Sequence, residues 1–188
     1  MSASLVDLER EAFARRADEV LDVYAEAMEV PRATARGRRS ILAAHLERDG
    51  LAAVGALDDD RLVGIAYGYR GAPGQWWHDQ VRAALDEATA VRWLDGSFEV
   101  CEFHVRPSHQ GTGLGRALLA RLLSRTDART AVLTTPDHDT RARRFYATAG
   151  WVDLARDLRF PGDPRSFAVL ALPLEALPLE PGPLASTG

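Results

Sequence analysis

Residues 105–116 constrain the fold of this chain more than any other segment. An apolar run ends at Val105, a short loop follows, and the glycines Gly111, Gly113 and Gly115 lead into an amphipathic pattern. This order predicts a strand that turns into a helix within a few residues. Backbone N–H groups at a helix start lack partners within the helix and carry partial positive charge. The turn is therefore suited to a bulky anion such as a pyrophosphate.

Two better-known phosphate-binding patterns do not fit this turn. No Lys-Ser or Lys-Thr pair follows the glycines, which excludes a P-loop. The glycine spacing of dinucleotide-binding folds is also absent, and no acidic residue ends a following strand at the required distance. Glycines that only shape a tight strand-to-helix turn are the alternative to an anion site.

Periodicity along the rest of the chain predicts an α/β fold. Strands are expected at 51–57, 61–69, 97–105, 130–135, 151–160 and 166–172. Helical patterns cover 15–28, 41–46, part of 75–94, 113–125 and 139–149, while 5–13 fits a strand or a helix. The arginine run at 32–39 fits the solvated start of a helix. Because hairpins occur at both ends of this order, the sheet must be mixed.

Length, charge and cysteine content restrict the classes of function. The chain has 188 residues, which we assign to one domain at 1–174 and a Pro- and Leu-rich tail at 175–188. A net charge of −4 argues against nucleic acid as a partner, and the lack of a long apolar run argues against a membrane. The single cysteine, Cys101, excludes a disulfide framework, and we expect no metal. With no signal peptide, these features predict a cytoplasmic protein.

Two motifs resemble those of the GNAT superfamily of acyl-CoA-dependent N-acyltransferases. The pattern Gln110-x-x-Gly113-x-Gly115 resembles motif A of that family, and the strand end at 103–107 is similar as well. Downstream, 144–151 is similar to motif B, a tyrosine followed after three residues by glycine and an aromatic residue. The resemblance implies the GNAT fold, an α/β (α+β) arrangement with a mixed central sheet of six or seven strands flanked by helices. Splayed strands would form the acyl-CoA cleft.

The resemblance also implies acetyl-CoA as a co-substrate, lying between the strand that ends at Val105 and the strand at 130–135. Strand residues would pair with the pantetheine amides, and backbone N–H groups of 111–116 would hold the pyrophosphate. The residues expected to bind acetyl-CoA are Phe103, His104, Val105, Gln110, Gly111, Thr112, Gly113, Leu114, Gly115, Arg116, Asp139 and Tyr146. Asp139 stands where the family often has Asn, and a carboxylate only accepts hydrogen bonds, so an N-cap role is the alternative.

The reaction of the family implies the chemistry that the site would need. An amine attacks the thioester directly in a ternary complex, so the amine must lose a proton and the departing thiolate must gain one. Tyr146 matches the motif B tyrosine, whose hydroxyl would lie near the thioester sulfur and serve as the proton donor. A tyrosine that only packs in the core is the alternative.

Three residues of the strand at 97–105 are candidates for the base. Glu99 ranks first because several acetyltransferases of the superfamily place a catalytic Glu or His at about that spacing before motif A. Glu102 ranks second and His104 third, and ion pairs with arginine are the alternative for both carboxylates. Strand alternation places Glu99 and Phe103 on one face, and Glu102 and His104 on the other. A bulge near the cleft would reorient the second set.

An aromatic cluster is the candidate acceptor pocket. It consists of Tyr67, Tyr69, Trp76, Trp77 and Asp79, and an aromatic wall with a carboxylate suits a cationic amine. Closure of the core by the tryptophans is the alternative. The sequence thus predicts an N-acetyltransferase for a small-molecule amine or a peptide or protein amino group. A catalytically silent acyl-CoA sensor and a nucleotide-binding protein are the rival functions. Because dimers are common in the family, the resemblance also allows a homodimer, although no sequence feature demonstrates one.

Overall fold

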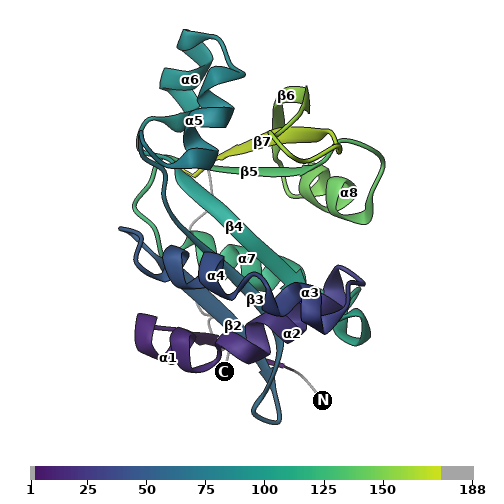
Figure 1. Cartoon of the computed structure of the whole chain (residues 1–188). Helices are drawn as coiled ribbons and strands as arrows, with labels where there is room; N and C mark the ends of the chain where they lie inside the picture. Colours follow the sequence, from purple (N-terminus) through teal and green to yellow (C-terminus); the bar gives the residue numbers. More distant parts are fainter. Residues whose placement is uncertain (1–2, 175–188) are drawn as a thin grey trace, which may run out of the picture.

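The computed structural model describes residues 3–174, so the tail expected at 175–188 lies outside the described residues. Within them, seven strands form one sheet in the order β1-β2-β3-β4-β5-β7-β6 (Figure 1). The strands are β1 (Ser4–Asp7), β2 (Ala52–Asp58), β3 (Arg61–Arg70), β4 (Phe98–Val105), β5 (Thr130–Pro136), β6 (Val152–Leu158) and β7 (Phe167–Pro173). Neighbouring strands are antiparallel except β4 and β5, which confirms the predicted mixed sheet.

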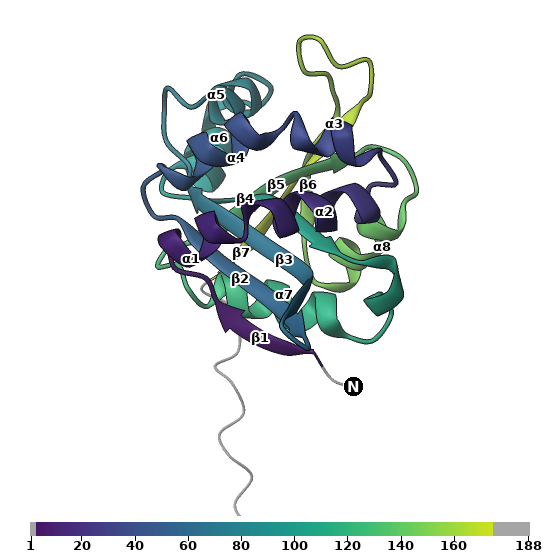
Figure 2. The same cartoon turned by 60° about the horizontal axis from the view of Figure 1, so that its bottom comes forward.

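Helices flank the sheet on both faces. They are α1 (Arg10–Arg15), α2 (Ala17–Ala27), α3 (Arg32–Arg36), α4 (Arg39–Leu46), α5 (Trp76–Ala83), α6 (Glu87–Leu94), α7 (Leu114–Leu123) and α8 (Arg141–Thr148). Helices α1–α4 cover one face of β2–β4, and α7 covers the opposite face (Figures 1 and 2). The ambiguous segment 5–13 contains both elements, because β1 ends before α1 begins. Within residues 3–174 no helix has the length and apolar character needed to cross a membrane.

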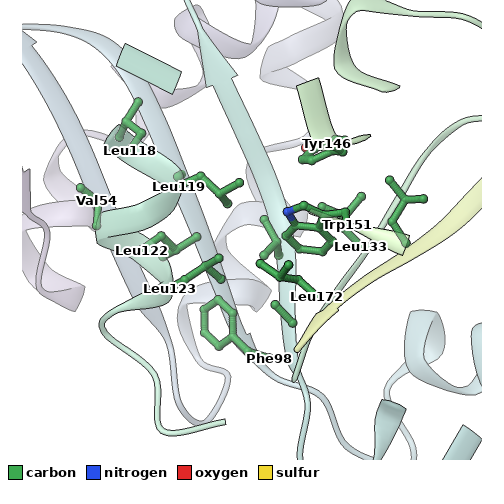
Figure 3. Packing of buried hydrophobic residues seen from close by; sticks show 14 of the residues in the cluster. Val54, Phe98, Leu118, Leu119, Leu122, Leu123, Leu133, Tyr146, Trp151 and Leu172 are labelled. Carbon is green, nitrogen blue, oxygen red and sulfur yellow. The ribbon is translucent and has the colours of Figure 1, made fainter. Parts of the chain in front are cut away.

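The apolar face of α7 forms the centre of the largest core cluster. Leu118, Leu119, Leu122 and Leu123 are all buried there, as the amphipathic pattern predicts. Figure 3 shows Leu122 and Leu123 near Phe98 of β4, with Leu133 of β5, Leu172 of β7 and Trp151, which precedes β6, on the other side. Burial of one such leucine contributes roughly 1.5–3 kcal/mol, so this packing fixes α7, and the glycine turn before it, against β4.

A bulge in β4 changes which of its side chains share a face. Tyr67 of β3 lies opposite Glu102, whereas the next residue, Gly68, lies opposite Val100, so that Cys101 is the extra residue of β4. One extra residue reverses the alternation of a strand on either side of it. The bulge that the sequence analysis allowed for is therefore present.

The bulge brings three polar side chains of β4 to the face that α1–α4 cover. Glu99 contacts Tyr69 there, Glu102 pairs with an arginine that precedes α4, and His104 packs on a ring of α2. Phe103 lies on the other face, in the cluster of α7. The prediction that Phe103 shares a face with Glu99 is wrong, because simple alternation does not hold across a bulge.

Strands β4 and β5 separate soon after they pair. Their ladder has two residue pairs, Phe98 with Ala131 and Glu99 with Val132. Beyond these pairs the edge of β4 that faces β5 carries no ladder hydrogen bonds in the described chain. The fold therefore contains the splayed strands that the resemblance implies, and it exposes backbone donors and acceptors between them.

Between β3 and β4 the chain makes an excursion through α5 and α6. These helices pack on β5 and β7 through buried residues such as Val81 and Leu94, in a cluster separate from that of α7. Ala90 and Val132 are fully buried in the same cluster. The excursion therefore covers the far half of the sheet, beyond the point where β4 and β5 part.

Candidate active site

A cleft of about 680 Å³ opens where β4 and β5 separate. Its walls come from both strands, the glycine-rich turn before α7, the start of α8, the end of α2 and the start of β7. All the residues expected to bind acetyl-CoA line this cleft except Thr112, Leu114 and Asp139. The structure thus brings motifs A and B together around one cavity.

The glycine-rich turn presents bare backbone to the cleft. Gly113 is the N-cap of α7 and has φ +87°, a left-handed conformation that side chains rarely adopt. A Cβ built on Gly113 meets no heavy atom within 4 Å, so a side chain there would project into open space. The first N–H groups of α7 have no partner within the helix. This is the arrangement that a pyrophosphate requires.

Gln110 ties the two motifs to each other. Its Nε2 donates to the carbonyl oxygen of Val105 at 2.8 Å, and its Oε1 accepts from Arg141 Nη1 at 2.7 Å. Arg141 is the first residue of α8 and lines the cleft. The amide of Gln110 therefore holds a cation beside the glycine-rich turn, where it would complement an anion.

Tyr146 lies in the cleft with its ring fixed among aromatic neighbours. The ring packs against Phe145 and Trp151 with centroid distances of 5.4 and 5.5 Å. Burial, and then the negative charge of Glu102, raise the pKa of the Tyr146 hydroxyl above its usual value. The hydroxyl is therefore protonated at neutral pH and is able to donate a proton.

Glu102 and His104 form a hydrogen-bonded pair on the wall that β4 contributes. His104 Nε2 lies 2.5 Å from Glu102 Oε2, and Arg38 Nη2 lies 2.5 Å from Glu102 Oε1. Burial raises the pKa of Glu102, but the hydrogen bond from His104 and the charges of His104 and Arg38 outweigh it and hold that pKa below its usual value. Glu102 is therefore ionised and has one partner on each of its carboxylate oxygens.

Helix α2 completes this corner of the cleft. The guanidinium of Arg38 lies over the ring of Tyr24 at 4.6 Å from its centroid, and His104 meets the same ring edge-on at 5.2 Å. Both contacts restrict the orientation of the pair on β4. His104 Nδ1 has no hydrogen-bond partner among residues 3–174, which leaves it available to a ligand.

Glu99, ranked first as the base, does not line the cleft. It is 5% exposed, and its Oε1 accepts from the Tyr69 hydroxyl at 3.3 Å, while Oε2 has no partner in the described residues. Burial raises the pKa of Glu99 to about 7. The side chain has a suitable pKa for a base but is placed behind the wall of the cleft, with Cys101 in front of it.

Asp139 does not serve as the N-cap of α8. Thr140 has that role, because its side chain accepts from the backbone N–H of Arg143 at 3.0 Å. Asp139 instead pairs with Arg144 at 2.6 Å, with both side chains mostly exposed. The N-cap interpretation is wrong, because the helix begins one residue later than that interpretation requires.

None of the five residues expected in the acceptor pocket lines the cleft. Tyr67 and Tyr69 are buried under α4. Trp77 donates from Nε1 to the Thr134 hydroxyl at 3.2 Å, and Trp76 is 56% exposed beside Phe160. Thr134, the partner of Trp77, lines the cleft. The acceptor pocket on these residues stays a prediction.

Several residues of the cleft escaped the sequence analysis. Tyr24, Met28 and Arg38 line it from α2 and the segment before α4, and Arg165 and Phe167 line it from the approach to β7. Tyr24 and Met28 belong to the stripe of apolar residues in the helical pattern expected at 15–28. Nothing in the sequence indicates that this stripe lies against β4. Within residues 3–174 no group of three or more metal-ligating side chains could hold a metal ion.

Two comparisons with known proteins indicate the same family as the sequence motifs do. The model of the acetyltransferase (GNAT) family matches residues 17–151. The GCN5-like protein acetyltransferase Rv2170 of Mycobacterium tuberculosis is 37% identical in an alignment of 206 residues, gaps included, that covers 93% of this chain and 100% of that protein.

Solved structures of low sequence identity share the fold. A GNAT-family protein from Desulfovibrio desulfuricans superposes with a TM-score of 0.67 at 21% identity, covering 92% of this chain and 99% of that one. The yncA protein of Salmonella typhimurium, solved with its cofactor acetyl-CoA, gives a TM-score of 0.62 at 15% identity, with 97% and 99% covered. These likenesses show the fold.

Proposed function

Because this chain belongs to the acetyltransferase (GNAT) family, we propose that it moves the acetyl group of acetyl-CoA to a primary amine by direct attack in a ternary complex. Acetyl-CoA is its acyl donor, as in the family. The observation that carries the proposal is the placement of the Glu102–His104 pair and of Tyr146 on one cleft. A proton acceptor and a proton donor then share the space in which the thioester would lie.

The cleft fits acetyl-CoA along its length. The pyrophosphate is held by N–H groups of 111–116, with Arg141 beside it. The pantetheine pairs with the free edge of β4 at 103–105, as an added strand would. This places the thioester near the bulge at Cys101, at the level of the catalytic groups.

His104 is the base in this proposal, and Glu102 orients it. Glu102 is held ionised by two partners and does not retain a proton at neutral pH, whereas an imidazole is the side chain best suited to proton transfer near neutral pH. In the neutral ring Nε2–H donates to Glu102, so Nδ1 is the free acceptor. A free primary amine has a pKa of about 10.4, so this deprotonation must precede attack.

Tyr146 donates the proton that the CoA thiolate takes up. Its hydroxyl has no partner among the described residues and it lines the cleft, so the proton is not committed to another group. The raised pKa keeps this proton in place until a stronger base forms beside it. The thiolate that leaves when the tetrahedral centre collapses is such a base.

We propose that the acceptor enters beside Tyr24 and Phe167, at the end of the cleft that these aromatic residues line. The relative from Mycobacterium tuberculosis is described as a protein acetyltransferase, which favours an amino group of a protein or peptide. A small-molecule amine fits the same opening. The aromatic rings at this end suit the alkyl part of either acceptor.

Release of free thiol from acetyl-CoA with a panel of amines and peptides tests the proposal. We expect turnover that falls about 10²–10⁴-fold in His104→Gln and Tyr146→Phe, with binding of CoA retained. His138→Gln is the matched control, because that side chain is exposed and outside the cleft. Binding of acetyl-CoA without turnover of any acceptor would instead support the silent sensor. Equal turnover in all three variants would refute the assigned roles.

A further inference from the structure

The proposed reaction leaves one proton in the active site in each cycle. The acceptor enters as an ammonium ion and loses two protons before it becomes an amide, and the CoA thiolate takes up one of them. The other must reach solvent while CoA and the acceptor fill the cleft. The inference below rests on the proposed function, and it concerns the route of that proton.

A second, small cavity lies behind the catalytic pair, toward α4. Its volume is about 20 Å³, and it is lined by apolar side chains of α2 and α4 together with Tyr24, Tyr67, Arg38, Glu102 and His104. The last three also line the main cleft, so they form the partition between the two spaces. A space of this size with several polar groups around it accommodates one water molecule.

Tyr67 connects this small cavity to α4. It lies directly opposite Glu102 in the β3–β4 ladder and is 2% exposed. Its hydroxyl lies 3.1 Å from Nδ1 of His45, a residue of α4. Burial, and then the charge of Glu102, raise the pKa of Tyr67 well above its usual value, so the hydroxyl is protonated at neutral pH.

His45 is half-buried and stands at the solvent end of this row. Burial lowers its pKa, the charge of Glu102 raises it, and the charges of Arg38 and Arg48 lower it further, so that it is lowered overall. Tyr69 of β3 packs edge-on against the same ring at 5.3 Å. A neutral His45 accepts a hydrogen bond on Nδ1 and carries a proton on Nε2.

We propose that Glu102, one water of the small cavity, Tyr67 and His45 form a proton exit from the active site to the solvent beside α4. His104 Nδ1 takes the proton of the ammonium, and its Nε2 proton moves to Glu102. The carboxyl passes a proton to the water, the water passes one to the Tyr67 oxygen, and the Tyr67 hydroxyl proton moves to His45 Nδ1. His45 releases its Nε2 proton to solvent, so one proton enters and one leaves. Return of the two rings to their first tautomers completes the cycle.

Tyr67→Phe and His45→Ala test the exit, with the full chain, acetyl-CoA and the best acceptor of the panel. We expect kcat to fall about tenfold or more in both variants, with KM for each substrate within about twofold. Since proton export then limits turnover, the solvent deuterium isotope effect on kcat rises. Added imidazole restores kcat in His45→Ala, which a purely structural role would not allow.

Tyr69→Phe is the matched comparison, because it removes an equally buried hydroxyl from the same strand face, one that bonds Glu99. We expect its isotope effect to match that of the parent. Equal effects in Tyr67→Phe and Tyr69→Phe, or no rescue of His45→Ala by imidazole, would overturn the proton exit. If Tyr67→Phe fails to fold, the restoration of kcat in His45→Ala by added imidazole decides whether the proton exit exists. If His104→Gln loses activity while Tyr67→Phe and His45→Ala keep the kcat of the parent, the proton exit is refuted but the proposed function stands.

Discussion

Glu99 and Glu102 show how different surroundings on one strand shift the pKa values of two glutamates in opposite directions. Both are mostly buried and both belong to β4. Glu102 has a cation and an imidazole as partners, whereas Glu99 has a hydroxyl and a thiol. The pKa of Glu102 is therefore lowered and that of Glu99 is raised to about 7. Charge complementarity, rather than depth of burial, decides the difference.

The raised pKa of Glu99 makes stability depend on pH. Between its usual pKa of 4.5 and about 7, the folded protein keeps a proton that the unfolded chain loses, so stability falls as pH rises through that window. At about 1.36 kcal/mol per pH unit, this amounts to roughly 3 kcal/mol. Glu99→Gln removes the ionisable group, and we expect it to raise the free energy of unfolding at pH 8 by up to that amount and to change little at pH 4.5.

Urea unfolding of parent and variant at the two pH values measures this effect. Glu47→Gln, which removes an exposed carboxylate, is the control and should leave the pH dependence as it is. A Glu99→Gln variant that is no more stable than the parent at pH 8 would show that Glu99 ionises without penalty in the fold.

The bulge in β4 depends on a glycine in β3. A Cβ on Gly68 would lie 2.1 Å from the carbonyl oxygen of Glu99 and 2.6 Å from the ring of Phe98, so one of the strands would have to move. We expect Gly68→Ala to destabilise the fold by about 3 kcal/mol or more. Gly96→Ala is the comparison for strain: Gly96, unlike Gly68, has a positive φ, but nothing lies within 4 Å of its Cβ position, so conformational strain alone costs about 1–2 kcal/mol there. Thermal unfolding of both variants compares the two costs, and equal losses would contradict the close contact.

The turn before α7 is the element on which acetyl-CoA binding depends most. Gly113→Val places a branched side chain in the open space over the first N–H groups of the helix. We expect the affinity for CoA to fall at least about tenfold by calorimetric titration, because the pyrophosphate loses close contact with the backbone. Gly162→Val is the control for strain, since Gly162 also has positive φ and open space but lies in the β6–β7 loop. Unchanged CoA affinity in Gly113→Val would remove the turn from the binding site.

At the level of elements, the sequence predicted helices and strands wherever a repeat of apolar residues extended over several residues. The α7 stripe, the β2–β3 hairpin and the helix of motif B all follow from apolar spacing and turn residues. The position of the bulge did not follow, because it depends on which residues of β3 face β4. Alternation alone therefore could not predict the face of the sheet on which Phe103 and Glu102 lie.

At the scale of the whole molecule, motifs A and B were predictable and their partners were not. Both motifs are local patterns, and the fold places them on one cleft as the family resemblance implies. Arg38 and Tyr24 lie more than sixty residues before His104 and reach it only through packing of α2 and α4 on the sheet. Conversely, Trp76 and Trp77 are close to β3 in sequence, yet the excursion through α5 carries them behind the cleft. The chemical character of these side chains does not indicate which residues, near or far in the sequence, lie close together in the fold.

A crystal structure with CoA and an acceptor bound tests the central claim most directly. We predict that the pantetheine lies between β4 and β5, with its sulfur within hydrogen-bonding reach of the Tyr146 hydroxyl and the acceptor nitrogen near Nδ1 of His104. The pyrophosphate then contacts the backbone of 111–116. CoA bound at another surface, or an acceptor nitrogen that is close to neither His104 nor Glu102, would contradict the account.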